Sequence, residues 1–135
     1  MRILLVDDDP DLVGAVSAML RHHGHTVETA ADGAAALRLA ASRPEAVLLD
    51  LHLPDVDGFE VAQALRAGLL AHEASIIVIT GHKAQLEVAD RAGVDLLLEK
   101  PVDSQHLGGL VEYITKRRHD MLHTAGSAAI RCIRW

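Results

Sequence analysis

The feature that most constrains the fold of this chain is an alternation of short aliphatic runs with longer segments of helical spacing. The runs predict β-strands at residues 2–6 (RILLV), 25–30 (HTVETA), 45–50 (EAVLLD), 75–80 (SIIVIT) and 94–98 (VDLLL). The first, third and fourth runs are almost continuously apolar, which is typical of strands that helices cover on both faces. The alternation therefore predicts an α/β fold with a parallel sheet.

The segments between these runs carry apolar residues at the three- and four-residue spacing of amphipathic helices. This spacing marks five helices, around residues 12–20, 35–39, 61–65, 86–89 and 107–114. Five strands that alternate with five helices imply a doubly wound sheet with right-handed crossovers and a helix layer on each face. In such a sheet a ligand binds outside the carboxyl ends of the strands, at the point where the strand order reverses.

Residues at the expected helix ends fit this division. Asp9 before Pro10 predicts an N-cap followed by proline at the first helical position. Gly24, Gly68 and Gly93 come just after predicted helices, where a left-handed cap is favoured.

Length and composition indicate one cytoplasmic domain. The chain of 135 residues is long enough for one hydrophobic core, and its single cysteine, Cys132, excludes an internal disulfide and fits a reducing compartment. We find no apolar run of membrane-spanning length and no signal peptide, so we expect no membrane association. The net charge of −6 argues against non-specific nucleic-acid binding by the whole chain, although residues 116–135 are basic.

Polar side chains follow the predicted strands at one edge of the sheet. Asp7 and Asp8 follow the first strand, Asp50 and Thr80 end the third and fourth, and Lys100 follows the fifth. Clustered carboxylates repel one another unless a cation compensates them, and carboxylate oxygens are suitable ligands for Mg²⁺. A metal-bound phosphoryl group could also meet a lysine ammonium and a threonine hydroxyl, and a carboxylate can itself act as the nucleophile. These residues predict magnesium-assisted phosphoryl transfer, with Asp50 as the best acceptor.

The same segments carry a family resemblance. The motifs ILLVDDDPDL, VLLDLHLPDVDGFEV, IIVITGH and LLLEKPVD, in this order and spacing, resemble the receiver domain of two-component response regulators. The resemblance covers residues 1–118 and leaves residues 119–135 as a basic C-terminal tail or linker. It implies a flavodoxin-like (βα)5 fold with a five-stranded parallel sheet in the order 2-1-3-4-5.

The resemblance also assigns a role to each site residue. It implies that Asp50 is the phosphoacceptor and that Asp8 coordinates Mg²⁺ directly, while Asp7 does so largely through water. His52 would contribute its backbone carbonyl to the metal. Thr80 would be the switch hydroxyl, and Lys100 would contact the phosphoryl group.

One position departs from the family pattern. The residue three before the lysine is usually Tyr or Phe, and here it is Leu97. In the family that ring moves inward when the threonine engages the phosphoryl group. Leucine can repack but has no ring to reposition, so the resemblance leaves the output mechanism open.

Two other functions would also use a carboxylate-rich or phosphate-binding edge of such a sheet. A magnesium-dependent phosphatase with an aspartyl nucleophile, on the same fold class, would place a second acid two residues after the nucleophile, where this chain has His52. A nucleotide or flavin binder would need a Gly/Ser/Thr-rich loop after the first strand, where this chain has DDDPD. We therefore expect a signalling switch that assists its own phosphorylation and dephosphorylation rather than an enzyme.

The expected partners follow from that function. The resemblance implies a sensor histidine kinase or a phosphotransfer protein as donor and a downstream effector that the sequence does not identify. We expect no membrane partner and no direct nucleic-acid binding by residues 1–118, and the sequence leaves a homodimer open.

Overall fold

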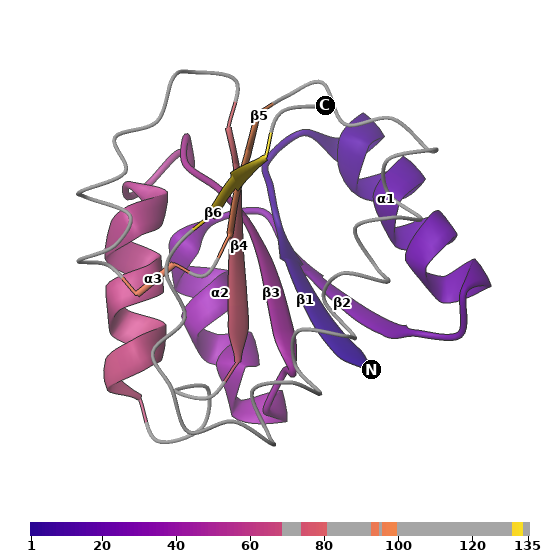
Figure 1. The fold of residues 1–135 in the computed structure, drawn as a ribbon, viewed down its shortest axis with the longest axis horizontal. Coiled ribbons are helices and arrows are strands. Elements are labelled where there is room, and N and C mark those ends of the chain that lie inside the picture. Colours follow the sequence, from indigo (N-terminus) through magenta and orange to yellow (C-terminus); the bar gives the residue numbers. More distant parts are fainter. Residues whose placement is uncertain (69–73, 81–92, 95, 100–130, 134–135) are drawn as a thin grey trace.

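The computed structural model describes residues 1–68, 74–80, 93–94, 96–99 and 131–133. Its strands form one parallel sheet in the order β2-β1-β3-β4-β5-β6 (Figure 1). The strands are β1 (Arg2–Val6), β2 (Thr26–Ala30), β3 (Ala46–Asp50), β4 (Ser75–Thr80), β5 (Leu96–Glu99) and β6 (Arg131–Ile133). The predicted order 2-1-3-4-5 is thus confirmed, and each of the five predicted strands is present to within two residues at either end.

The sixth strand was not predicted. β6 lies in the segment that the sequence assigned to a tail or linker, and it pairs in parallel with β5. No hydropathy pattern marks it, because the RCI segment is short and lies between basic residues. The boundary at residue 118 stays a prediction.

Three helices and a short 3-10 turn belong to the described part of the chain: α1 (Pro10–His22), α2 (Gly33–Leu39), η1 (Ala40–Ser42) and α3 (Gly58–Ala67). They match the first three predicted helices. The predicted helices around residues 86–89 and 107–114 lie outside the described residues. In this part of the chain no helix is both long and apolar enough to cross a membrane.

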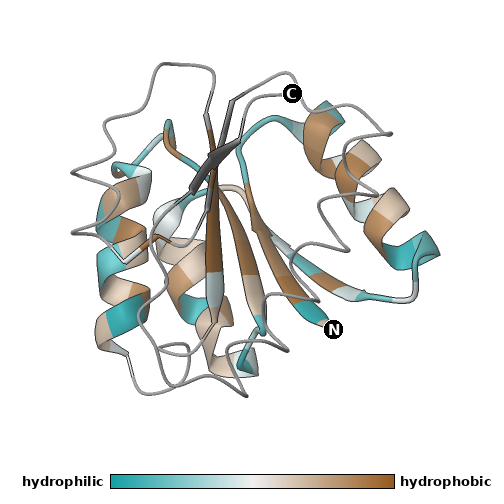
Figure 2. Ribbon diagram, viewed as in Figure 1, coloured by the Kyte–Doolittle hydropathy of each residue, from teal (hydrophilic) through white to brown (hydrophobic). Residues whose placement is uncertain are grey.

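Helices lie on both faces of the sheet, with α1 on one side and α2 and α3 on the other (Figure 1). Alternate residues of β1 point to opposite faces. Ile3 and Leu5 join a core cluster with Val16 and Leu20 of α1, whereas Leu4 and Val6 join a second cluster with residues of α2 and α3. Figure 2 shows hydrophobic residues along the central strands and hydrophilic residues in the coloured parts of the connecting loops. The doubly wound architecture follows from strands that are apolar on both faces.

The helix ends confirm most of the predicted signals. Asp9 caps α1 by accepting hydrogen bonds from the backbone N–H groups of Asp11 and Leu12, and Pro10 is the first helical residue. Gly24 and Gly93 have φ angles of 90° and 78°, as predicted for left-handed positions. The prediction for Gly68 was wrong, since its φ of −78° and ψ of 148° are extended.

A side chain from α3 contacts the segments that lead into β4 and β5. The Arg66 guanidinium donates from Nε to the carbonyl of Gly93, at 2.8 Å, and from Nη1 to the carbonyl of Ala74. These carbonyls lie just before β4 and β5. Arg66 therefore fixes the start of both strands against the end of α3.

Candidate functional site

Two adjacent strands bring three carboxylates together at the carboxyl edge of the sheet. β1 and β3 pair with Val6 opposite Leu49, so that the next residues, Asp7 and Asp50, lie side by side. The backbone N–H of Asp7 still donates to the carbonyl of Ala30 in β2, at 3.0 Å, which keeps Asp7 in line with the sheet. Sequence alone placed these residues at one edge, and the parallel register brings their side chains into one cluster.

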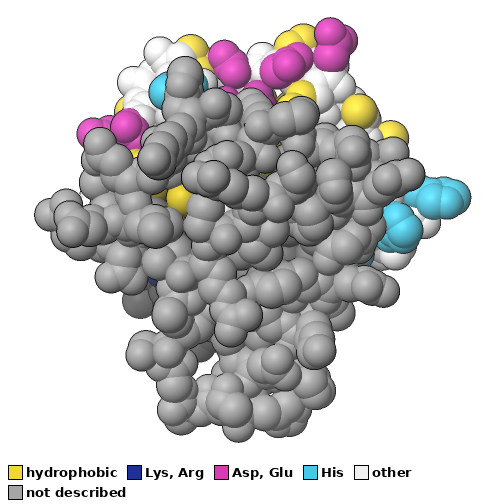
Figure 3. All heavy atoms as spheres, turned by 45° about the horizontal axis from the view of Figure 1, so that its top comes forward, with side chains coloured by type: hydrophobic (Ala, Val, Ile, Leu, Met, Phe, Trp, Pro, Cys, Tyr) yellow, Lys and Arg dark blue, Asp and Glu magenta, His cyan; other side chains and the backbone are white. Residues whose placement is uncertain are grey.

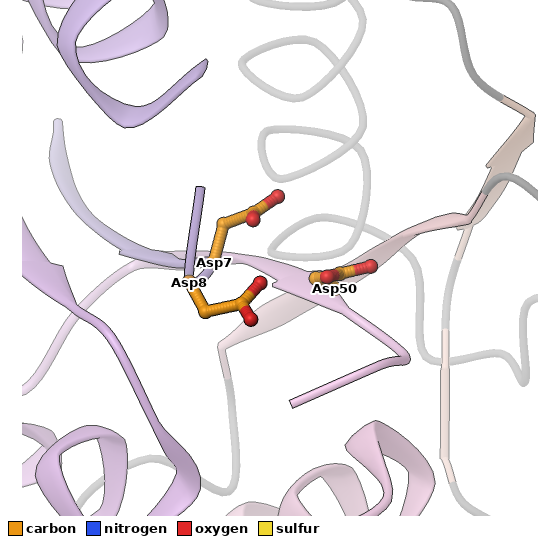
Figure 4. A group of neighbouring side chains, drawn as sticks. All are labelled: Asp7, Asp8 and Asp50. Carbon is orange, nitrogen blue, oxygen red and sulfur yellow. The ribbon is translucent and has the colours of Figure 1, made fainter. Parts of the chain in front are cut away.

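The geometry of this cluster suits a small cation. One carboxylate oxygen from each of Asp7, Asp8 and Asp50 lies within 4.8 Å of the other two (Figure 4). Asp7 and Asp50 are buried, with only 4% and 5% of their surface exposed, whereas Asp8 is exposed. Carboxylates this close repel one another, and a hard divalent cation with oxygen ligands would offset that repulsion. Among the described residues, Asp7, Asp8 and Asp50 are the His, Cys, Asp or Glu side chains whose oxygen or other ligand atoms come close enough together to hold a metal ion.

An open pocket lies beside the acidic cluster. Figure 3 shows several Asp and Glu side chains along the upper edge of that view, among side chains of other kinds. The pocket is lined by Asp8 and by residues 51–57 of the loop between β3 and α3. Asp8, the exposed member of the three, connects the cluster with this pocket.

Backbone contacts join the two ends of the loop at residues 51–57 to each other. His52 and Asp57 form an antiparallel bridge, and the N–H of Gly58 donates to the carbonyl of Leu51 at 2.9 Å. A Cβ atom at Gly58 would collide with the carbonyl oxygen of Asp50 and would lie 2.8 Å from the Cα of Leu51. Only glycine allows α3 to begin this close to the end of β3.

The middle of the loop is fastened to α2. The Asp55 carboxylate accepts hydrogen bonds from the backbone N–H groups of Gly33 at 2.9 Å and Ala34 at 3.0 Å. The hydrogen bond from Gly33 is the main cause that lowers the pKa of Asp55 below its ordinary value. The charged form of Asp55 is therefore favoured by its contact with the first turn of α2.

Comparison with known proteins decides the family. The family model of the response regulator receiver domain matches residues 3–117. This chain belongs to that family. Receiver domains of response regulators are signalling domains, and the family supports a phosphorylation-dependent switch in a two-component system.

Curated relatives carry the receiver domain within longer chains. The transcriptional regulatory protein PrrA of Mycobacterium tuberculosis is 39% identical over 123 residues, which are 87% of this chain and 51% of PrrA. The transcriptional regulatory protein KdpE of the same species is 33% identical over 129 residues, 95% of this chain and 54% of KdpE. The chain thus spans about half the length of the curated relatives it matches.

Solved structures share the fold of this receiver domain. The chemotaxis response regulator CheY4 of Vibrio cholerae superimposes with a TM-score of 0.78 at 28% identity, over 84% of this chain and 97% of CheY4. The receiver domain of a sensor histidine kinase from Pseudomonas aeruginosa gives a TM-score of 0.76 at 32% identity, over 87% of this chain and 97% of its own. That structure has a magnesium ion coordinated in the active site cleft.

The remaining predicted site residues of the receiver domain are placed only in part. His52 is exposed and lines the pocket beside Asp8. Thr80 ends β4 one residue beyond Ile79, the partner of Asp50, so its backbone reaches the same edge of the sheet. Lys100 lies outside the described residues, directly after Glu99 of β5, which pairs with Thr80.

Sequence reasoning missed the part that Asp55 plays. In the same loop, Asp57 caps α3 by accepting a hydrogen bond from the N–H of Phe59, and Gly58 begins that helix. The capping signal was present, since an Asp followed by Gly precedes a helical pattern. The contact between Asp55 and α2 joins residues that lie 22 positions apart, and no local pattern signals it.

Proposed function

We propose that this receiver domain accepts a phosphoryl group on the side chain of Asp50, with Mg²⁺ held by the acidic cluster, and that the phosphorylated form binds its partners differently. The observation that supports this most is the cluster of Asp7, Asp8 and Asp50 at the carboxyl ends of β1 and β3. Bound Mg²⁺ would neutralise negative charge on the phosphoryl oxygens and on the cluster.

The reaction needs little from the protein besides position and charge. A carboxylate oxygen of Asp50 attacks the phosphorus atom, a P–O bond forms, and the P–N bond to the donor histidine breaks. The electron pair of the broken bond stays on the imidazole nitrogen of the donor. Asp50 suits this role because it is the last residue of β3 and is held in the sheet opposite Ile79.

The other site residues take the roles that the family implies. Asp8 coordinates the metal directly, Asp7 largely through water, and His52 through its backbone carbonyl. Thr80 donates its hydroxyl to a phosphoryl oxygen, and Lys100 contacts the phosphoryl group through its ammonium. These assignments are supported by the position of Asp7, Asp8 and Asp50 in one cluster and of Thr80 at the same edge.

We propose that the domain is a switch and not a phosphatase. An aspartyl phosphatase needs a second acid two residues after the nucleophile, and that residue here is the exposed His52. The phosphoryl donor is then a histidine kinase or a phosphotransfer protein in the cytoplasm. PrrA and KdpE are named as transcriptional regulators, and their names make gene control a reasonable output for a longer protein that contains this domain.

Leu97 bears on how phosphorylation at the site could change the surface that a partner binds. It is buried in the core cluster on the side of α2 and α3. A buried leucine in this place cannot offer a hydroxyl or a ring to a partner. We propose that the output depends on repacking around β4 and β5, and that it leads to an effector or to a second copy of this chain.

The experiment that tests the proposed function is phosphorylation by acetyl phosphate. With Mg²⁺, the mass of the intact protein should rise by about 80 Da, the mass of one phosphoryl group joined as an acyl phosphate. Without Mg²⁺, or in Asp50→Asn with Mg²⁺, the mass should stay unchanged. Equal labelling of Asp50→Asn would reject Asp50 as the acceptor.

A further inference from the structure

The loop at residues 51–57 has to hold one orientation if the His52 carbonyl is to face the acidic cluster. Its two ends are fixed by the bridge between His52 and Asp57 and by the hydrogen bond from Gly58 to Leu51. These contacts close the loop on itself. They do not set the direction in which its middle points relative to the sheet.

Asp55 and Val56 join the middle of the loop to the first turn of α2. The Asp55 carboxylate accepts from two successive N–H groups, one at each oxygen. Next to this contact, a Cβ atom at Gly33 would collide with the Val56 side chain and would lie 3.1 Å from that of Val61. A polar contact and a close steric contact therefore hold the same two segments together.

The contact is more than a helix cap. α2 already has its own N-cap, Asp32, whose side chain accepts from the N–H of Ala35 at 2.7 Å. Asp55 takes the two N–H groups that precede it, those of Gly33 and Ala34. Two carboxylates thus serve one helix terminus, and only Asp55 comes from the loop that borders the metal cluster.

We propose that Asp55 is a positioning residue for the phosphorylation site, because its tether to α2 fixes the loop that presents the His52 carbonyl to the metal. This inference rests on the proposed function. Asp55 itself touches neither the metal nor the phosphoryl group in this account. Mutation of a side chain that orients a metal-ligating residue typically weakens metal binding by about 10- to 100-fold.

The test compares Asp55→Ala with Asp32→Ala in the full chain by calorimetric titration of Mg²⁺. Both variants remove one carboxylate that accepts hydrogen bonds at the same end of α2, two bonds for Asp55 and one for Asp32, so each loses one negative charge and weakens the start of the helix. We expect Asp55→Ala to weaken Mg²⁺ binding about tenfold, and Asp32→Ala to weaken it less than about twofold. Equal weakening in the two variants would overturn the positioning role.

Two further variants guard against loss of folding and against a pure charge effect. Asp55→Asn keeps the shape and one acceptor oxygen, so it should fold and bind Mg²⁺ with intermediate affinity. Gly33→Ala changes no charge but pushes Val56 away, and it should also weaken Mg²⁺ binding. Wild-type affinity in both variants would overturn the inference.

The same titration separates this inference from the proposed function. If the wild-type chain binds Mg²⁺ and is labelled by acetyl phosphate, but the variants do not weaken Mg²⁺ binding as expected, only the role of Asp55 is rejected. If the wild-type chain does neither, the proposed function fails and the positioning role fails with it.

Discussion

Charge repulsion in the acidic cluster predicts that removal of Asp8 stabilises the metal-free protein. The carboxylate oxygens of Asp7, Asp8 and Asp50 lie within 4.8 Å of one another. At 4.8 Å, Coulomb's law gives about 0.9 kcal/mol for each pair of charges at the dielectric constant of water and about 3.5 kcal/mol at an effective value of 20. Asp8 is exposed, so the lower value applies, and salt screens part of it. Asp8→Ala relieves two pairs and should raise the free energy of unfolding by about 1–2 kcal/mol in the absence of Mg²⁺.

Magnesium should offset this advantage. At a free Mg²⁺ concentration ten times the dissociation constant, wild type gains about 1.4 kcal/mol from binding. Asp8→Ala lacks the carboxylate that we propose as a direct ligand of the metal, and it should gain little. The difference between the two proteins should therefore close when Mg²⁺ replaces a chelator in the buffer.

Urea unfolding followed by far-UV circular dichroism measures both quantities, and Asp11→Ala is the matched control. Asp11 is also exposed, but it lies in the first turn of α1 and outside the cluster. Its loss should cost a few tenths of a kcal/mol, through the helix dipole, and should leave the Mg²⁺ response intact. The reasoning would be refuted if Asp8→Ala were less stable than wild type without Mg²⁺, or if both variants kept the full Mg²⁺ response.

Three further predictions follow from single contacts. Gly58→Ala should cost about 1–3 kcal/mol of stability and slow labelling by acetyl phosphate, because the added methyl group meets the Asp50 carbonyl; full stability and a normal rate would contradict it. Arg66→Met should lower the free energy of unfolding in urea by about 2 kcal/mol, because the carbonyls of Gly93 and Ala74 lose the guanidinium that donates to them. An unchanged unfolding midpoint would count against this role of Arg66. Burial lowers the pKa of His25 below 6.5, so the unfolded chain binds the proton more readily and stability should fall as the pH drops through 6.5. The stability of His25→Gln should fall less steeply than that of wild type over the same pH range. Parallel curves of stability against pH for the two proteins would rule out a contribution from His25.

The sequence predicted the architecture well because the strands carry their own signal. Val47, Leu48 and Leu49 form part of a wholly buried β3, and a strand covered on both faces must be apolar throughout. Asp50 could be placed at the edge of the sheet because it ends that run. The strand order, in contrast, came from family resemblance, since local patterns do not say which strands are neighbours.

Features that depend on contacts between distant segments could not be predicted. The tether from Asp55 to Gly33 requires that the loop after β3 and the start of α2 lie side by side, which only the folded chain shows. The strand β6 depends on pairing with β5 rather than on its own hydrophobicity. Gly68 follows α3 as predicted, but an extended backbone satisfies its N–H through Ala64 and Leu65 without a left-handed turn.

The most direct test of the central claim locates the phosphoryl group on the chain. After treatment with acetyl phosphate and Mg²⁺, borohydride reduces an aspartyl phosphate to homoserine, and tandem mass spectrometry of the peptides finds the residue that has changed. The account predicts homoserine at position 50 only when both the donor and Mg²⁺ were present, with Asp7 and Asp8 unaltered. Homoserine at Asp7 or Asp8, or an intact Asp50 in protein whose mass had risen, would contradict it.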